Sequence, residues 1–262
     1  MHHRVNAISV ALLAFAAGAC GNKEQVVEAK GSCADVFTAQ VCTWASTRGK
    51  NLVEAGAVVP LASIENAPAE QPMAWPPASA AEIDMPDLVR GQGGLQLLTM
   101  YWEPHGHPPG AFMTPHFDFH FYTVPASERA AMDCKDLSKP ASLPAGYALP
   151  DLPLPPEMAQ MTGVDALIGL CVPQMGMHSV PVADVERKDA FSGSIVIGYY
   201  KGKPVFVEPM IAKATLMQKQ SFDLTIPDVP GLTGAHPTKF HAEFDAGQQA
   251  YRFTFSRFTP AG

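Results

Sequence analysis

The chain has 262 residues, of which 47% are hydrophobic and 16% are charged, and its formal net charge is −7. This length and composition predict a globular protein with one large domain or two small ones. The chain carries no run of Lys and Arg. Contact with a phosphate backbone needs clustered positive charge, so we expect no nucleic-acid partner. The 25 prolines disfavour long helices and favour strands, turns and extended connections.

The N-terminus is typical of a secretory signal peptide. A short basic start with Arg4 precedes an apolar run from Val10 to Ala17, which is too short to span a bilayer. Small residues then precede Cys20, as in bacterial lipoproteins, whose cysteine receives the lipid. We predict a signal peptide over residues 1–19 and a lipid anchor on Cys20 as the only membrane contact. The protein would then be periplasmic or anchored to the outer membrane, and plain secretion is the alternative.

The cysteine content agrees with export. The four cysteines after Cys20 are Cys33, Cys42, Cys134 and Cys171. An even number in an exported chain predicts disulfides, and we expect nearest neighbours to pair, Cys33 with Cys42 and Cys134 with Cys171. A zinc site built from thiolates is the alternative, although the chain lacks a Cys-x-x-Cys pair.

The region after Cys20 predicts a tether and then a covering segment. Residues 20–32 are polar and indicate the tether, and residues 33–89 indicate an N-terminal segment that covers the main domain. A short helix is expected over 33–48, and a strand followed by a turn over 50–64. Residues 66–86 are rich in Pro and Ala, which predicts an extended chain wrapped on the protein body.

Residues 90–262 have the pattern of a β domain. Apolar, β-compatible runs predict strands over 94–102 and 116–124, and Lys201-Gly202 suits the turn of a hairpin. Further strands are expected over 191–200, 203–207, 220–226, 239–244 and 249–258. About eight strands separated by turn signals predict a mainly β fold, an antiparallel sandwich or barrel with a few short helices and long Pro-rich connections.

The run from His116 to Tyr122 alternates aromatic and polar residues. Side chains on a strand point to opposite faces in turn, so two sets separate. One face presents Phe117, Phe119 and Phe121, and the other presents His116, Asp118 and His120. The aromatic face suits a core, and the polar face gathers groups that bind metals and transfer protons. A slip of one residue would exchange the faces, so the sequence leaves open which face is inward.

The loop before this strand adds two more histidines. If the strands over 94–102 and 116–124 pair antiparallel, the loop between them returns His105 and His107 to the end where His116 begins. Three imidazoles would then meet at one end of a hairpin.

Strand geometry limits how these residues can share an ion. His116 and His120 would have Cα atoms roughly 13 Å apart, whereas residues two apart are separated by about 6.6 Å. We therefore expect Asp118 to join one of the two histidines, with other ligands from elsewhere. The predicted ligand set is His107, His116, Asp118, His120, His178 and Glu208. Nitrogen and oxygen ligands of this kind suit zinc, iron, manganese or copper.

Two functions from different classes fit these residues. The first is an exported lipoprotein that binds a divalent metal; if it is an enzyme, it would be a metal-dependent hydrolase or an oxygenase-like enzyme acting on a small molecule. Asp118 or Glu208 would then act as the general base. The second is a metal-free binding or assembly module, in which the polar residues form a hydrogen-bonded network and an exposed Trp75 or Trp102 marks a partner surface.

Several motifs resemble one family of exported bacterial proteins. They are Trp102-x-Pro104-x-Gly106-His107-x-Pro109, the run from Pro115 to Tyr122, Pro173-x-Met175-Gly176-x-His178, the run from Glu208 to Ile211, and Gly234-x-His236-Pro-Thr238. Over residues 90–258 the chain resembles the TTHB210-like, or DUF5602, domain. The resemblance implies a mainly β fold, export, often as a lipoprotein, and self-association into a ring-shaped homo-oligomer. It implies no particular reaction.

Overall fold

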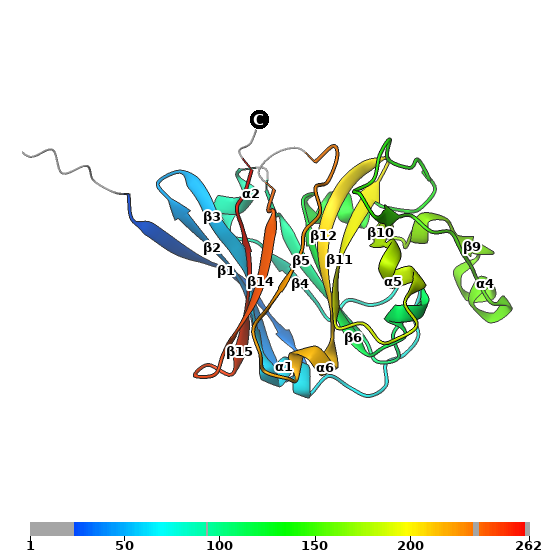
Figure 1. Cartoon of the computed structure of the whole chain (residues 1–262), viewed down its shortest axis with the longest axis horizontal. Helices are drawn as coiled ribbons and strands as arrows, with labels where there is room; N and C mark the ends of the chain where they lie inside the picture. Colours follow the sequence, from blue (N-terminus) through cyan, green and yellow to red (C-terminus); the bar gives the residue numbers. More distant parts are fainter. Residues whose placement is uncertain (1–23, 93, 233–235, 260–262) are drawn as a thin grey trace, which may run out of the picture.

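The computed structural model describes residues 24–92, 94–232 and 236–259, and its strands build two large sheets and one small one (Figure 1). Sheet 1 has the strand order β1-β2-β3-β15-β14-β13, and sheet 2 has the order β4-β5-β6-β12-β11-β10-β7. Neighbouring strands are antiparallel throughout both sheets. The predicted mainly β fold is confirmed, and it is a sandwich. The predicted signal peptide and Cys20 lie outside the described residues.

The strands of sheet 1 are β1 (Val26–Val36), β2 (Ala39–Arg48), β3 (Asn51–Pro60), β13 (Phe222–Leu224), β14 (Lys239–Asp245) and β15 (Ala250–Ser256). Those of sheet 2 are β4 (Ala81–Asp84), β5 (Leu97–Glu103), β6 (His116–Tyr122), β7 (Tyr147–Ala148), β10 (Met177–Pro181), β11 (Gly193–Tyr200) and β12 (Lys203–Ala212). A small separate sheet pairs β8 (Leu152–Pro153) with β9 (Ala166–Leu167).

The described helices are all short, as the proline content predicts. The α-helices are α1 (Leu61–Glu65), α2 (Asp87–Arg90), α3 (Ala126–Ala130), α4 (Pro156–Thr162), α5 (Val182–Glu186) and α6 (Lys213–Leu216). The 3-10 helices are η1 (Gly110–Phe112) and η2 (Ile168–Leu170). Within the part of the chain that the structure covers, no helix has the length and apolar character needed to cross a membrane.

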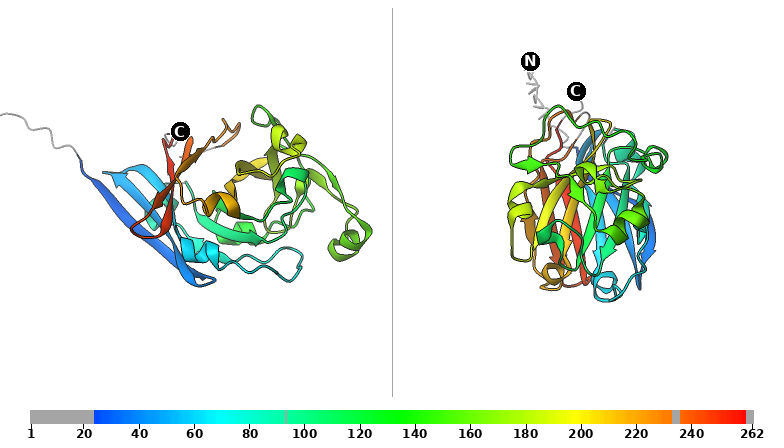
Figure 2. Two further views of the ribbon diagram at one scale, coloured as in Figure 1. Left: turned by 60° about the horizontal axis from the view of Figure 1, so that its bottom comes forward. Right: turned by 90° about the vertical axis from the view of Figure 1, so that its right-hand side faces the viewer.

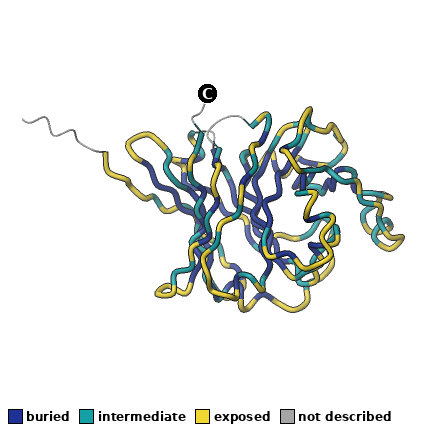
Figure 3. The backbone as a smooth tube through the Cα atoms, viewed as in Figure 1, coloured by how far each residue is buried: buried dark blue, intermediate teal, exposed yellow. Residues whose placement is uncertain are grey.

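Buried residues concentrate where the two sheets face each other (Figure 3). The core that they form is rich in aromatic rings. On β6, Phe119 contacts Phe253 with ring centroids 4.8 Å apart, and Phe121 contacts Phe255 at 4.7 Å. Both partners come from β15 in sheet 1, so the phenylalanine face of β6 points inward. Fully burying a phenylalanine side chain stabilises a fold by about 1.5–3 kcal/mol, and this fixes the orientation that the sequence left open.

The N-terminal part differs from its prediction. Residues 26–48 form β1 and β2 of sheet 1 and not a tether and a helix, whereas the strand expected over 50–64 is confirmed as β3. Strand β3 pairs with β15 from Glu54 to Pro60, which places the first and the last strand of the described chain in one sheet. Residues 33–48 are rich in Ala, Val and Thr, a composition that is compatible with a helix or a strand. Pairing with β3 stabilises the strand.

One hairpin turn and both disulfides agree with the sequence. The hairpin at Lys201-Gly202 joins β11 to β12, and both turn residues have positive φ, as a type I′ turn requires. Disulfides join Cys33 to Cys42 across the β1–β2 hairpin and Cys134 to Cys171 between two loops. These bonds are typical of oxidising compartments, and they leave no thiolates for the alternative zinc site.

The polar face of β6 points away from sheet 1 but is covered from solvent. His116, Asp118 and His120 are all buried. Pro-rich segments within residues 71–78, 103–113 and 152–175 close over this face, and Figure 2 shows them on the side of sheet 2 that faces away from sheet 1. The predicted extended segment over 66–86 therefore wraps on the body where the polar residues lie.

Candidate metal site

The register of sheet 2 brings the polar residues together. Strand β6 lies between β5 and β12, and Glu103 of β5 pairs with His116. On the other side, Val207 pairs with Phe121 and Met210 with Asp118 in one continuous register. This register places Glu208 across from His120 on the outer face of the sheet.

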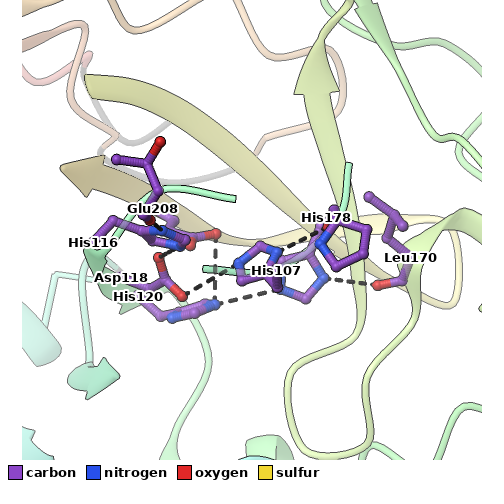
Figure 4. Close-up of polar contacts among 9 residues, drawn as sticks. His107, His116, Asp118, His120, Leu170, His178 and Glu208 are labelled. Carbon is purple, nitrogen blue, oxygen red and sulfur yellow. Dashed lines mark hydrogen bonds and ion pairs between the residues drawn. The ribbon is translucent and has the colours of Figure 1, made fainter. Parts of the chain in front are cut away.

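The first set of donors, which we call the aspartate group, consists of His107, His116 and Asp118. The Nε2 atom of His116 lies 3.1 Å from Asp118 Oδ1, and His107 Nε2 lies 3.7 Å from Asp118 Oδ2 (Figure 4). The loop that follows β5 supplies His107, and the antiparallel β5–β6 pairing carries it back to His116, as the sequence predicted.

The second set, the glutamate group, consists of His120, His178 and Glu208. The Nε2 atom of His120 lies 3.5 Å from Glu208 Oε2 and 3.4 Å from His178 Nε2 (Figure 4). Three different strands of sheet 2, β6, β10 and β12, hold these residues, so the group depends on the order of the strands.

Backbone carbonyls orient three of the four imidazoles. The Nδ1–H of His116 donates to Thr114, that of His107 to Pro108, and that of His178 to Leu170, at distances of 2.6, 2.9 and 2.9 Å. A neutral ring then carries its proton on Nδ1 and presents the lone pair of Nε2. Histidines that bind metals are held in this way, by a hydrogen bond from the nitrogen that does not touch the ion.

Several polar atoms of the two donor groups are buried and have no hydrogen-bond partner among the described residues. These atoms are His116 Nε2, Asp118 Oδ1, His120 Nδ1 and Glu208 Oε2. His116 Nε2 and Asp118 Oδ1 are close, yet their geometry is not that of a hydrogen bond. Each unpaired buried group costs about 1–3 kcal/mol, so such a cluster indicates a missing partner.

The spacing of the donors suits a metal ion. Metal–ligand bonds of 2.0–2.2 Å in a tetrahedral site separate the ligand atoms by ~3.4 Å. The four distances within the two groups are 3.1, 3.4, 3.5 and 3.7 Å. In each group, one ligand atom from every residue lies within 4.8 Å of the others. Either group could supply three ligands to one ion.

The two groups differ in charge. Burial opposes ionisation of Asp118, but the charges of His116 and His107 outweigh it and hold the pKa of Asp118 well below its usual range. Partial burial opposes protonation of His107, and the adjacent Asp118 carboxylate outweighs it and raises the pKa of His107 to about 9. The aspartate group therefore holds an internal ion pair at neutral pH.

In the glutamate group, burial favours the neutral form of every member. Burial, together with the charge of Asp118, raises the pKa of Glu208 well above its usual range. Burial also lowers the pKa of His178 to about 4 and that of His120 well below its usual value. Neutral imidazoles are the form that binds metal ions.

A cavity of about 530 Å³ lies over the two groups. Its lining includes Asp118, His107 and all three members of the glutamate group, so both groups face the cavity. Glu103 also lines it and belongs to neither group. Burial and the charge of Asp118 raise the pKa of Glu103 to about 7. A metal ion in either group could therefore meet a small molecule in the cavity.

The structure brings together all six residues of the predicted ligand set. Asp118 lies with His116 and not with His120, as the strand spacing allowed. His105 does not join them, because its exposed ring contacts Glu70 instead. Sequence reasoning missed Glu103, although the expected β5–β6 pairing places it directly opposite His116.

The tryptophans correct one expectation of the metal-free alternative. Trp102 is buried, and its Nε1–H donates to the carbonyl of Pro68 at 2.7 Å, so it marks no partner surface. It faces the core because it pairs with Phe117 on the inward face of sheet 2. Trp75 is half-buried and lines the cavity.

In comparisons with known proteins, no family model, no curated protein and no solved structure matches this chain.

Proposed function

We propose that this protein is an exported metalloprotein that binds a divalent transition metal ion in each donor group and acts on a small molecule in the cavity above them. The three histidines whose Nδ1–H donates to a backbone carbonyl carry the proposal. The Nε2 atoms of His107 and His116 lie 3.7 and 3.1 Å from Asp118 oxygens, and that of His178 lies 3.4 Å from His120 Nε2, which are separations that a shared metal ion would give. A network without metal would use these Nε2 atoms in hydrogen bonds, whereas His116 Nε2 is buried without one.

Each group offers three protein ligands, which is the number found in catalytic rather than structural zinc sites. A bound ion would supply Lewis acidity and acidify a water molecule at its free position. Asp118 and Glu208, the general bases expected from the sequence, would then be occupied as ligands. Glu103 lines the same cavity outside both groups, so we assign the proton-accepting role to it.

Export, the lipid anchor on Cys20 and membership of the TTHB210-like family are part of the same proposal. The two disulfides support export, because such bonds persist in oxidising compartments. Assembly of several copies into a ring is compatible with metal binding and is expected only from the resemblance.

The test is elemental analysis of residues 21–262 purified without a metal-affinity tag. We expect about two equivalents of zinc, iron, manganese or copper per chain, and about one equivalent in each of His116→Ala and His178→Ala. His241→Ala is the matched control, since His241 lies on β14 of sheet 1 and contacts Asp223. Wild-type protein that stays metal-free after each ion is added back would refute the proposal and favour the metal-free assembly module.

A further inference from the structure

The walls of the cavity differ in chemistry from its floor. Its floor carries Glu103 and five of the six donor residues, all except His116, while the walls are mainly Pro, Leu, Val and Met. Among the described residues, six methionines line it: Met73, Met113, Met158, Met161, Met175 and Met210. Methionine side chains adapt to the shape of an apolar partner, as they do at promiscuous binding surfaces.

The cationic imidazole of His107 lies in this lining but is already paired with the Asp118 carboxylate. No Lys or Arg is found among the described residues that line the cavity. Recognition of phosphate or of several carboxylates uses Arg and Lys, so nucleotides and polyanionic sugars are poor candidates for this site.

Apolar side chains are also exposed at the edge of the cavity. Met73 is 79% exposed, Met113 is 57% exposed and Met161 is 37% exposed. They come from the separate segments that cover the polar face of β6. Water contact with these side chains is unfavourable, and a molecule that covered them would gain about 25 cal/mol for each Å² of apolar surface buried.

We infer that the cavity binds a small, mainly apolar molecule that carries a single polar head group, with the head at the donor groups and the apolar body against the methionine-lined walls. A volume of about 530 Å³ admits a molecule of drug-like size. The binding of the head rests on the proposed metal function, whereas the binding of the apolar body rests on the walls alone.

Binding of an apolar body to the cavity walls is tested with N-phenyl-1-naphthylamine, an uncharged fluorescent probe. We expect saturable binding to metal-free protein, with energy transfer from Trp75, which lines the cavity. Trp75→Phe should reduce this transfer without removing the binding, and the remaining transfer would come from Trp44 and Trp102. No saturable binding, or transfer that is undiminished in Trp75→Phe, would overturn the inference.

A matched pair of variants on helix α4 tests where the probe sits. Met158 lines the cavity and Gln160 does not, and both lie on the exposed helix α4. We expect Met158→Glu to weaken probe binding about tenfold, because a carboxylate loses hydration against an apolar ligand. Gln160→Glu adds the same charge and should leave the affinity unchanged. Equal effects of the two variants would place the probe outside the cavity and overturn the inference.

Binding of the head group at the donor groups is tested with acetohydroxamate and octanohydroxamate. The two compounds share a metal-binding head and differ in the apolar body. With metal-loaded protein, we expect octanohydroxamate to bind at least about tenfold more tightly, since each buried methylene contributes about 0.8 kcal/mol. Equal affinities would overturn the inference while the metal content still supported the proposed function. Probe binding by a protein that takes up no metal would overturn the proposed function and leave the apolar site standing.

Discussion

The aspartate group and the glutamate group have the same composition and opposite electrostatics. Each has two imidazoles and one carboxylate, and both use β6 of sheet 2. In the first, Asp118 stays ionised beside His107 and His116. In the second, burial keeps Glu208 protonated beside two neutral histidines. Environment, not residue type, sets the charge of each group.

This difference has an energetic consequence. The aspartate group neutralises its own charge without an ion, so removing one member leaves an unpaired charge in a buried place. The members of the glutamate group are neutral, so removing one of them leaves no unpaired charge. The two groups should therefore respond differently to mutation, to metal and to pH.

The largest expected effect is that of Asp118→Asn in metal-free protein. The change keeps the size of the side chain and removes the anion that His107 and His116 face, so we expect a loss of about 3 kcal/mol in the free energy of unfolding. Urea unfolding in the presence of a chelator measures it. A loss below about 1 kcal/mol would mean that the buried ion pair does not form.

Metal addition should produce the next largest change in the free energy of unfolding. An ion that binds the folded state alone raises the free energy of unfolding by about 2.7 kcal/mol when its concentration is 100 times its Kd. Thermal unfolding with and without the ion measures this gain. In Asp118→Asn we expect the smaller part of the gain that comes from the glutamate group, and an undiminished gain would exclude the aspartate group as a metal site.

The raised pKa of His107 predicts a pH effect of definite sign. Protonation of His107 stabilises the metal-free fold fully below its ordinary pKa of 6.5, and this contribution is lost as pH rises towards about 9. The side chain is 37% exposed, so screening reduces the expected loss to about 1 kcal/mol.

Metal affinity should change in the opposite direction over the same pH range, because binding to Nε2 displaces the proton of His107. Urea unfolding and metal titration at several pH values measure the two trends. The control is His107→Ala, in which both trends should weaken, and unchanged trends there would assign them to another group.

The smallest expected effect is that of Glu208→Gln in metal-free protein. The carboxyl is already neutral and its Oε2 has no hydrogen-bond partner, so we expect a change within about 1 kcal/mol. The same variant should lose the ion of the glutamate group in elemental analysis. Urea unfolding at neutral pH gives the comparison with Asp118→Asn, and equal losses in the two variants would remove the distinction between the groups.

The sequence predicted the local features of the site well, because they follow from strand periodicity. The alternation from His116 to Tyr122 separated the phenylalanine face from the polar face, and antiparallel pairing of β5 and β6 explained the return of His107. All six expected donors lie together in two groups.

The remaining features depend on contacts between distant parts of the chain. The division into two groups follows from the order β6-β12-β11-β10, which places His178 and Glu208 near His120, and no local pattern encodes that order. Which face of β6 points inward is set by contacts of its phenylalanines with Phe253 and Phe255 of β15, which are distant in the sequence. Residues 33–48 were predicted as a helix because their composition suits both states, and only pairing in sheet 1 distinguishes them.

The carbonyl that orients His178 belongs to Leu170, and Leu170 directly precedes Cys171, which is joined to Cys134. If the glutamate group binds an ion as proposed, maturation would have a defined order. Before oxidation, the free thiols of these two cysteines would compete for the same soft ions, and the loop that holds Leu170 would be untethered. Closing the disulfide removes the competing ligands and fixes the loop in one step. Loading would thus follow oxidative folding, so a cell could supply the ion after export without guarding it from thiols on this chain.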